Sequence, residues 1–374
     1  LIGPSADNTR NMLGDYVYSA HVDSLEDAVP VVSIYEGIKT KLGDTVDINY
    51  AKGCEIMDED TSGFAEAITA AQNSDVAIVV VGGRSGLSGL VSPGDISDVD
   101  FTSIKGRIKD TDGESHDRTN LGLWGVQEDL VKAIYETGTP TIVVLINGRP
   151  LAINWIAEHI PAVLEAWLPG EEGGHAVADV LFGDYNPSGK LCVSIPKAVG
   201  QMPVHYHRTS ISSRRMYLEV DNKPLYPFGY GLSYTQFAYR NLTIMPNEHK
   251  APAQIVIECE VGNVGTVPGE EVVQLYIHDQ YASRTRPVKE LKGFAKVQLE
   301  PQQWKRVRFS LSADQLAFYS QAMELIVEPG SFSVMIGSSS LDIRLKDTFV
   351  INGDVYKVGK DRCFFSQVQI MDLD

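Results

Sequence analysis

The chain has 374 residues, of which 43% are hydrophobic and 22% charged; these are ordinary values for a globular protein and exclude general disorder. Its net charge of −17 excludes a typical nucleic-acid-binding protein, because that function needs a cationic surface that displaces counterions. The length suggests two domains, and the sequence has no run of about eighteen apolar residues that could insert into a membrane.

The start of the chain and its cysteines give two further expectations. LIGPSAD (1–7) is typical of the end of a buried strand that runs into a turn, and the chain does not begin with methionine. We therefore expect it to be the downstream part of a longer protein. The cysteines are scattered without a CxxC pair, which disfavours zinc and thioredoxin-like sites and leaves free thiols or one disulfide open. They are Cys54, Cys192, Cys259 and Cys363.

The first 200 residues alternate short apolar runs with helical patterns. The apolar runs are rich in β-branched residues and nearly continuous, as in parallel strands that are covered on both faces. They are DINYAKG (47–53), DVAIVVVGG (75–83), TIVVLINGRP (141–150) and AVLEAWLPG (162–170). Helical patterns precede two of these runs, at residues 64–74 and 126–138. This alternation predicts an open α/β sheet.

A long polar segment, residues 82–118, follows the second apolar run. It starts at the carboxyl end of a predicted strand, where open α/β sheets bind ligands, and loops of this length often carry function. Near its end Glu114 precedes Asp117 and Arg118 by three and four positions. A glutamate that acts as a general acid must stay protonated near neutral pH. Neighbouring carboxylates and partial burial raise the pKa of such a group, and Arg118 can hold the loop through a paired carboxylate. A merely solvated charged loop is the alternative.

Other catalytic signatures are weak. The GxSxG elbow of serine hydrolases and the glycine-rich phosphate loops are absent. His205 and His207 are two residues apart, which favours opposite sides of a strand over a shared metal ion. We therefore predict no metal site and no cofactor. Glu171 and Glu172 stand just before a predicted helix, where negative charge stabilises the helix N-terminus, so we interpret them as structural.

From residue 237 the pattern changes to alternating strands separated by Gly, Pro and Asn turns. These strands are expected at 237–246, 254–265, 270–279, 288–299, 305–313 and 330–340. Such spacing predicts an all-β immunoglobulin-like or fibronectin type III-like sandwich. The expected organisation is an α/β open-sheet sandwich domain over residues 1–236, this β-sandwich over 237–352, and a tail over 353–374 to which no element is assigned.

Six stretches, in order along the chain, resemble glycoside hydrolase family 3, the β-glucosidase and β-xylosidase type. They are LIGPSAD (1–7), VVGGRSGL (80–87), GESHDRTNLGLWGVQEDLV (113–131), TIVVLINGRPL (141–151), LEAWLPGEEGGHAVADVLFGDYNPSGKL (164–191) and YPFGYGLSYTQFAY (226–239). The later part resembles the fibronectin-like domain of the same family, in PGEEVVQLYI (268–277), PVKELKGFAKVQLEP (287–301) and VEPGSFSVMIGSSS (327–340).

The resemblance implies a retaining β-glycosidase of which this chain is the second and third part. The family's Asp nucleophile belongs to an N-terminal (β/α)8 barrel, for which the chain has no counterpart. The family's acid/base glutamate often lies in a GE-x-x-DR-like loop, and Glu114 is its counterpart here. Because this loop varies in the family, other carboxylates remain open: Asp95, Asp98 and Asp112. The candidate substrate-binding residues are Arg84, Ser85, His116, Asp117 and Arg118, and Ser115 is a further candidate for lining the pocket.

The implied function is the hydrolysis of terminal β-D-glucosyl residues. A β-xylosidase or α-arabinofuranosidase of the same family remains open, and so does a non-catalytic carbohydrate-binding module. The implied partners are a β-linked oligosaccharide or glucoside substrate and the barrel domain, in the same or a companion chain. Homodimer formation is left open, and neither nucleic-acid binding nor membrane insertion is expected. The family resemblance favours a periplasmic or secreted protein.

Overall fold

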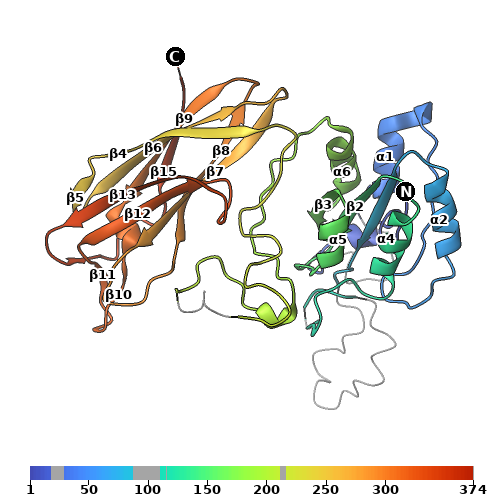
Figure 1. Ribbon diagram of the computed structural model, residues 1–374, viewed down its shortest axis with the longest axis horizontal. Helices are drawn as coiled ribbons and strands as arrows, with labels where there is room; N and C mark the ends of the chain where they lie inside the picture. Colours follow the sequence, from blue (N-terminus) through green and yellow to red (C-terminus); the bar gives the residue numbers. More distant parts are fainter. Residues whose placement is uncertain (18–28, 87–109, 115, 211–215, 374) are drawn as a thin grey trace, which may run out of the picture. The chain divides into compact units, whose positions relative to one another are not determined.

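The computed structural model describes residues 1–17, 29–86, 110–114, 116–210 and 216–373. The chain forms two compact units, the first made of Leu1–Tyr185 with Lys197–Gly200 and the second of Asn186–Pro196 with Gln201–Asp374. Figure 1 shows helices and a sheet in the first unit and packed strands in the second. The predicted fold class, an α/β domain followed by a β-sandwich, is confirmed.

The first unit is built on a parallel sheet of order β1-β2-β3, made of β1 (Ala77–Gly82), β2 (Thr141–Ile146) and β3 (Ala162–Trp167). Three of the four predicted strands are thereby confirmed. The fourth, residues 47–53, forms only one parallel bridge, between Ala51 and Ile2. Its apolar pattern is broken by polar residues that face solvent, so it has no continuous apolar face to bury.

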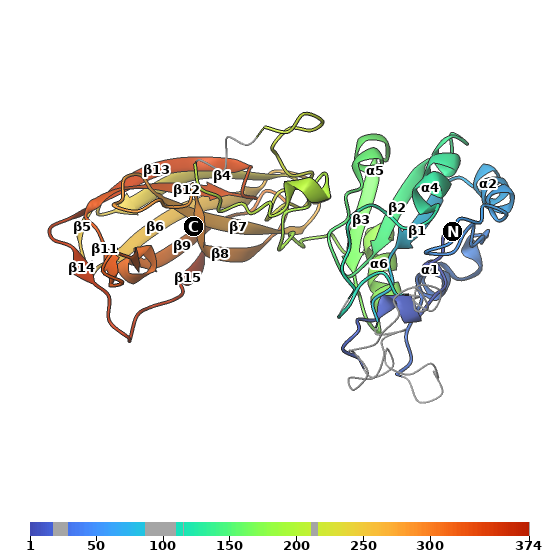
Figure 2. The same ribbon diagram turned by 90° about the horizontal axis from the view of Figure 1, so that it is seen from below.

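Helices cover both faces of this sheet, as Figure 2 shows, with α1 and α6 on one face and α4 and α5 on the other. The helices are α1 (Ile34–Leu42), α2 (Phe64–Gln72), α4 (Gln127–Tyr135), α5 (Asn154–His159) and α6 (Gly173–Phe182), with short 3-10 turns at η1 (Arg10–Met12), η3 (Gly43–Thr45) and η5 (Val199–Gln201). Glycines at positions 37 and 174 let α1 and α6 approach closely, because a Cβ on Gly37 would collide with the main chain of Gly174. Among the described helices, none has the length and apolar character needed to cross a membrane.

The second unit is a β-sandwich. One sheet has the order β5-β13-β12-β7-β8, the other β15-β9-β6-β4, and a small sheet has the order β10-β11-β14. The strands are β4 (Phe237–Met245), β5 (Glu248–Lys250), β6 (Gln254–Asn263), β7 (Gly269–Asp279), β8 (Glu290–Leu299), β9 (Trp304–Ser312), β10 (Phe318–Tyr319), β11 (Leu325–Val327), β12 (Gly330–Gly337), β13 (Ile343–Asn352), β14 (Tyr356–Lys357) and β15 (Gln367–Asp372), and the 3-10 turn η7 (Ala313–Leu316) follows β9. Alternate residues of the paired strands fill the core between the two larger sheets.

Residues 353–374, expected as a tail, contribute two of these strands. β15 pairs antiparallel with β9, from Gln367 opposite Ser310 to Asp372 opposite Lys305. β14 pairs with β11 in the small sheet. The end of the described chain is therefore an edge of the sandwich.

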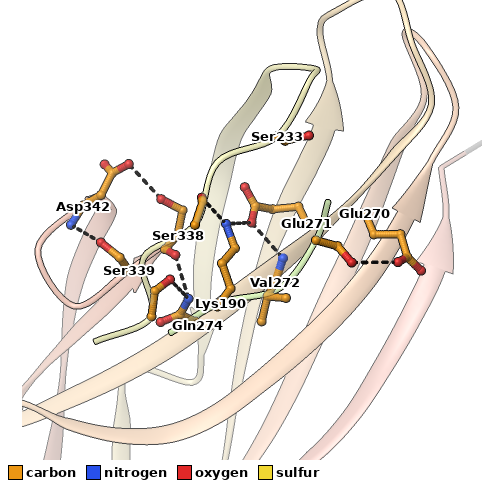
Figure 3. Close-up of polar contacts among 12 residues, drawn as sticks. Lys190, Ser233, Glu270, Glu271, Val272, Gln274, Ser338, Ser339 and Asp342 are labelled. Carbon is orange, nitrogen blue, oxygen red and sulfur yellow. Dashed lines mark hydrogen bonds and ion pairs between the residues drawn. The ribbon is translucent and has the colours of Figure 1, made fainter. Parts of the chain in front are cut away.

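The segment Asn186–Pro196 is joined to strand β7 by a buried ion pair. Lys190 Nζ lies 3.0 Å from Glu271 Oε1 and donates a hydrogen bond of 3.0 Å to the carbonyl of Gly231. The two side chains are only 14% and 6% exposed. Beside them, Gln274 donates to the carbonyl of Ser338, as Figure 3 shows. The buried Lys190–Glu271 ion pair therefore attaches this segment to the β-sandwich.

Glu271→Ala should lower the free energy of unfolding of the second unit by about 3 kcal/mol, because it leaves the Lys190 charge buried without its partner. Urea unfolding followed by tryptophan fluorescence measures the change. The control is Glu324→Gln, whose ion pair with Lys357 lies on the surface and should contribute less than about 1 kcal/mol. Equal losses in the two variants would contradict the prediction.

Candidate functional site

Two segments run side by side beyond the carboxyl end of β1. They are residues 83–86, which follow β1 directly, and residues 110–113, which lead into the predicted acid/base loop. Ser85 and Asp112 form a parallel bridge. The N–H of Thr111 donates to the carbonyl of Arg84 at 2.8 Å, and the N–H of Gly86 donates to the carbonyl of Asp112 at 3.2 Å. The loop therefore continues the sheet at the edge where open α/β sheets bind ligands.

Two buried carboxylates fasten this loop. Asp110, whose side chain is fully buried, has its Oδ1 at 2.9 Å from Arg84 Nε. Asp112, 3% exposed, has its Oδ1 at 2.9 Å from Arg149 Nε. In both pairs the two atoms are close enough for an ion pair, but their geometry is not that of a hydrogen bond. Asp112 Oδ2 also accepts the N–H of Gly148, just beyond β2, at 3.1 Å. The loop is thus tied to the carboxyl ends of both β1 and β2.

Hydrogen bonds fix the main chain of Glu114, whereas its side chain is exposed. Its N–H donates to Asp15 Oδ2 at 2.9 Å, and its carbonyl accepts from His116 Nδ1 at 2.8 Å in the tautomer that carries the proton there. The expected partial burial of Glu114 is not found in this chain, because anchoring acts on the backbone and leaves the carboxylate in solvent. Asp117 is exposed on the same loop.

The other open carboxylates differ from Glu114. Asp112 is buried and ion-paired, so it is not available to reach a substrate. Asp95 and Asp98 lie outside the described residues, as does Ser115. Among the described carboxylates weighed from the sequence for the acid/base role, Glu114 is therefore the exposed one.

The predicted substrate-binding residues are mostly engaged with the protein itself. Arg84 forms an ion pair with the buried Asp110. Ser85 is 2% exposed, and its hydroxyl accepts a hydrogen bond of 3.2 Å from the N–H of Asp15. His116 is half-buried, and its carbonyl accepts from Arg149 Nη2 at 2.6 Å.

Arg118 differs from the expectation that it pairs with a carboxylate. Its Nη2 donates to the carbonyl of Gly122 at 2.6 Å, and its guanidinium lies 5.0 Å from the ring centroid of Trp124. No ion pair of Arg118 is present within the described part of the chain. A main-chain carbonyl and an aromatic face replace the carboxylate, since Asp112, the acidic group whose charge acts on Arg118, is paired with Arg149.

The histidines of VHYHR also differ from the expectation. His205 and His207 do not lie on a strand, and their rings stack with centroids 5.1 Å apart instead of pointing to opposite sides. In the described residues no group of three or more His, Cys, Asp or Glu side chains is placed to hold a metal ion.

Glu165 is a titratable group at this edge that sequence reasoning missed. It lies near the carboxyl end of β3, and its Oε1 accepts the N–H of Trp167 at 3.1 Å. Burial raises the pKa of Glu165 to about 7, an effect that this hydrogen bond and one from Asn147 partly oppose. Within the described part of the chain, Asn147 Oδ1 is buried without a hydrogen-bond partner. The signal in the sequence was a lone acid inside the apolar run AVLEAW.

The pKa of Glu165 predicts how stability varies with pH. The folded-state pKa, about 7, is above the ordinary value of 4.5, so this group contributes full stability below about pH 4.5 and loses it as the pH rises towards 7. Glu165→Gln should remove that loss. Relative to the parent protein, the variant should therefore gain more stability at pH 8 than at pH 5. Urea unfolding at both pH values measures it, with Glu158→Gln, an exposed residue of α5, as the control. An unchanged pH slope in Glu165→Gln would contradict this assignment.

The fold and the site together define the class of this protein. It combines an open α/β sheet, with an anchored acidic loop at its carboxyl edge, and a β-sandwich that follows in the chain. The chain belongs to glycoside hydrolase family 3: the family's C-terminal domain matches residues 1–234, and its fibronectin type III-like domain matches residues 271–340. The family resemblance predicted from the motifs is confirmed.

Relatives of known name and structure are similar over nearly the whole chain. A β-xylosidase of Formosa agariphila is 44% identical over 343 residues, 91% of this chain and 44% of that protein. A periplasmic β-glucosidase of Salmonella typhimurium is 35% identical, over 92% of this chain and 45% of that protein. The structure of a Listeria innocua β-glucosidase in complex with glucose has a TM-score of 0.79 at 30% identity and covers 95% of this chain and 46% of its own. The chain thus spans less than half the length of these relatives.

Proposed function

We propose that this chain is the C-terminal part of a retaining, exo-acting β-glycosidase, with Glu114 as its general acid/base. One observation carries the proposal: within a family 3 chain, an exposed carboxylate stands on a loop whose backbone is anchored at the carboxyl edge of the α/β sheet. The nucleophile, an Asp, is assigned to an N-terminal barrel in the same or a companion chain.

The proposed reaction has two steps, which two carboxylates facing one anomeric carbon can carry out about 5–5.5 Å apart. In the first, the barrel Asp attacks the anomeric carbon while protonated Glu114 gives its proton to the departing glycosidic oxygen. The C–O bond breaks, and a glycosyl ester forms on the Asp. In the second step, Glu114, now a carboxylate, takes a proton from water as the water oxygen attacks the same carbon and releases the Asp.

Terminal β-D-glucosyl residues are the first candidate substrate. Relatives named β-glucosidase support it, including one with glucose bound. A β-xylosidase is the second candidate, because a more similar relative carries that name. The name of the periplasmic relative supports a periplasmic or secreted location. An α-arabinofuranosidase and a non-catalytic carbohydrate-binding module remain the alternatives.

The test is turnover with and without a barrel. The 41.0 kDa chain alone and the same chain joined to its barrel are assayed with p-nitrophenyl β-D-glucoside, β-D-xyloside and α-L-arabinofuranoside. We expect turnover only when the barrel is present, with the β-glucoside preferred. Turnover by the lone chain would contradict the assigned nucleophile. Saccharide binding without any turnover in the joined protein would favour the binding-module alternative.

A further inference from the structure

The carboxylate of Asp15 contacts the candidate acid/base residue from a distant part of the chain. Asp15 precedes Glu114 by 99 positions, and its Oδ2 accepts the N–H of Glu114 at 2.9 Å. Its other oxygen, Oδ1, accepts the hydroxyl of Ser85 at 3.3 Å, and its own N–H donates to the same hydroxyl at 3.2 Å. Asp15 and Ser85 thus form a reciprocal pair, which we call the Asp15–Ser85 clasp, and the clasp holds the peptide of Glu114.

The clasp stands on a fixed base. Ser85 is 2% exposed, and its carbonyl accepts a hydrogen bond of 2.7 Å from Arg10 Nη2. Ser85 also bridges to Asp112, the buried carboxylate that Arg149 pairs with. Because Ser85 and Asp112 are buried and Asp112 is ion-paired, Asp15 is held by a segment that cannot shift without breaking these hydrogen bonds and the ion pair.

Gly113 lets the loop approach the clasp closely. It has a φ of +114°, and a Cβ at this position would lie 2.6 Å from the carbonyl oxygen of Gly86 and 3.2 Å from Asp15 Oδ2. A side chain at residue 113 would push the loop away from Asp15. The close approach places the N–H of Glu114 where a carboxylate can accept it.

We infer that Asp15, supported by Ser85, is a positioning residue for the general acid/base Glu114; the inference rests on the proposed function. Asp15 holds the N–H of Glu114, and His116 holds its carbonyl, so both sides of the residue are fixed while its carboxylate stays exposed. Proton transfer to a departing oxygen requires placement within about 0.5 Å. If the loop were held only at its ends, the Glu114 carboxylate would sample many positions away from the reactive one.

The experiment uses the protein joined to its barrel and a series of aryl β-glycosides of the sugar it hydrolyses. Asp15→Ala should lower kcat/KM about 10- to 100-fold for phenyl glycosides, whose leaving group needs protonation. It should lower kcat/KM less than about threefold for 2,4-dinitrophenyl glycosides, whose leaving group does not. Asp15→Asn keeps one acceptor oxygen and should recover part of the loss. The control is Asp44→Asn, an exposed residue of η3, which should leave both substrates unaffected.

An equal loss on both leaving groups, or no loss, would overturn the positioning role, since a purely structural residue cannot discriminate leaving groups. If thermal unfolding shows that Asp15→Ala is not folded, the same kinetic comparison on Asp15→Asn tests the positioning role. Glu114→Gln, assayed with the same series of substrates, separates failure of the proposed function from failure of the positioning inference. Without leaving-group dependence in Glu114→Gln the proposed function fails, whereas dependence in Glu114→Gln but in neither Asp15 variant removes only this inference.

Discussion

Glu114→Gln should lower kcat/KM for phenyl β-glycosides about 100- to 10,000-fold in the protein joined to its barrel. Glutamine has nearly the same shape but has no proton to give to the departing oxygen. For 2,4-dinitrophenyl glycosides the first step should proceed, because that leaving group departs without protonation. The glycosyl ester should then accumulate, since no carboxylate remains to activate water, and turnover should fall. Steady-state kinetics over a series of leaving groups measures the effect.

Azide provides a second readout for the same variant. It is a nucleophile that needs no general base, so it should restore turnover of the dinitrophenyl glycoside and yield a β-glycosyl azide. The comparison is Asp117→Asn, on the same loop and also exposed. If Asp117→Asn shows the leaving-group dependence and azide rescue while Glu114→Gln does not, Asp117 takes the acid/base role. If neither does, the acid/base group lies elsewhere.

Arg149→Leu should lower the free energy of unfolding of the first unit by about 3–5 kcal/mol, because it leaves the Asp112 carboxylate buried and unpaired. Replacing both members of a buried ion pair is often nearly neutral. The double variant Asp112→Asn with Arg149→Leu should therefore regain most of the loss, with the asparagine oxygen still able to accept the N–H of Gly148. Urea unfolding of the single and double variants measures both effects.

An exposed ion pair provides the control. Lys132→Gln breaks the pair with Glu128 on the surface of α4, where both side chains are about one-third exposed, and should cost less than about 1 kcal/mol. A loss in Arg149→Leu as small as in this control would mean that solvent reaches Asp112. No recovery in the double variant would show that Arg149 stabilises the fold through contacts other than Asp112.

Local pattern predicted those elements whose own residues carry the signal. The runs that became β1 and β2 are almost entirely apolar, so their burial on both faces was readable from the sequence, whereas the run that became β3 contains Glu165 and is only partly buried. The strand β15 has no such run: most of its residues are exposed, and its pairing with β9 is what forms it. Edge strands of this kind depend on a partner distant in sequence, which a local pattern does not contain.

The candidate site divides in the same way. Glu114 was found because its loop motif is contiguous in the sequence. Asp15 was not found, since nothing near it in the sequence indicates that it contacts a residue 99 positions later. Ser85 and Arg84 were correctly placed at the end of β1, but whether a side chain there faces a ligand or an acidic neighbour depends on the fold of residues 110–112.

The core of the β-sandwich has a consequence for anyone who dissects the protein into fragments. The stretch that matches the fibronectin-like family, residues 271–340, starts within β7 and ends just after β12. Core residues on both sides fall outside it, among them Ile257 on β6 and Phe349 on β13. A fragment excised at the limits of sequence similarity would lose whole strands from both sheets. The unit that can fold on its own is set by packing, and it is wider than the segment by which the family is recognised.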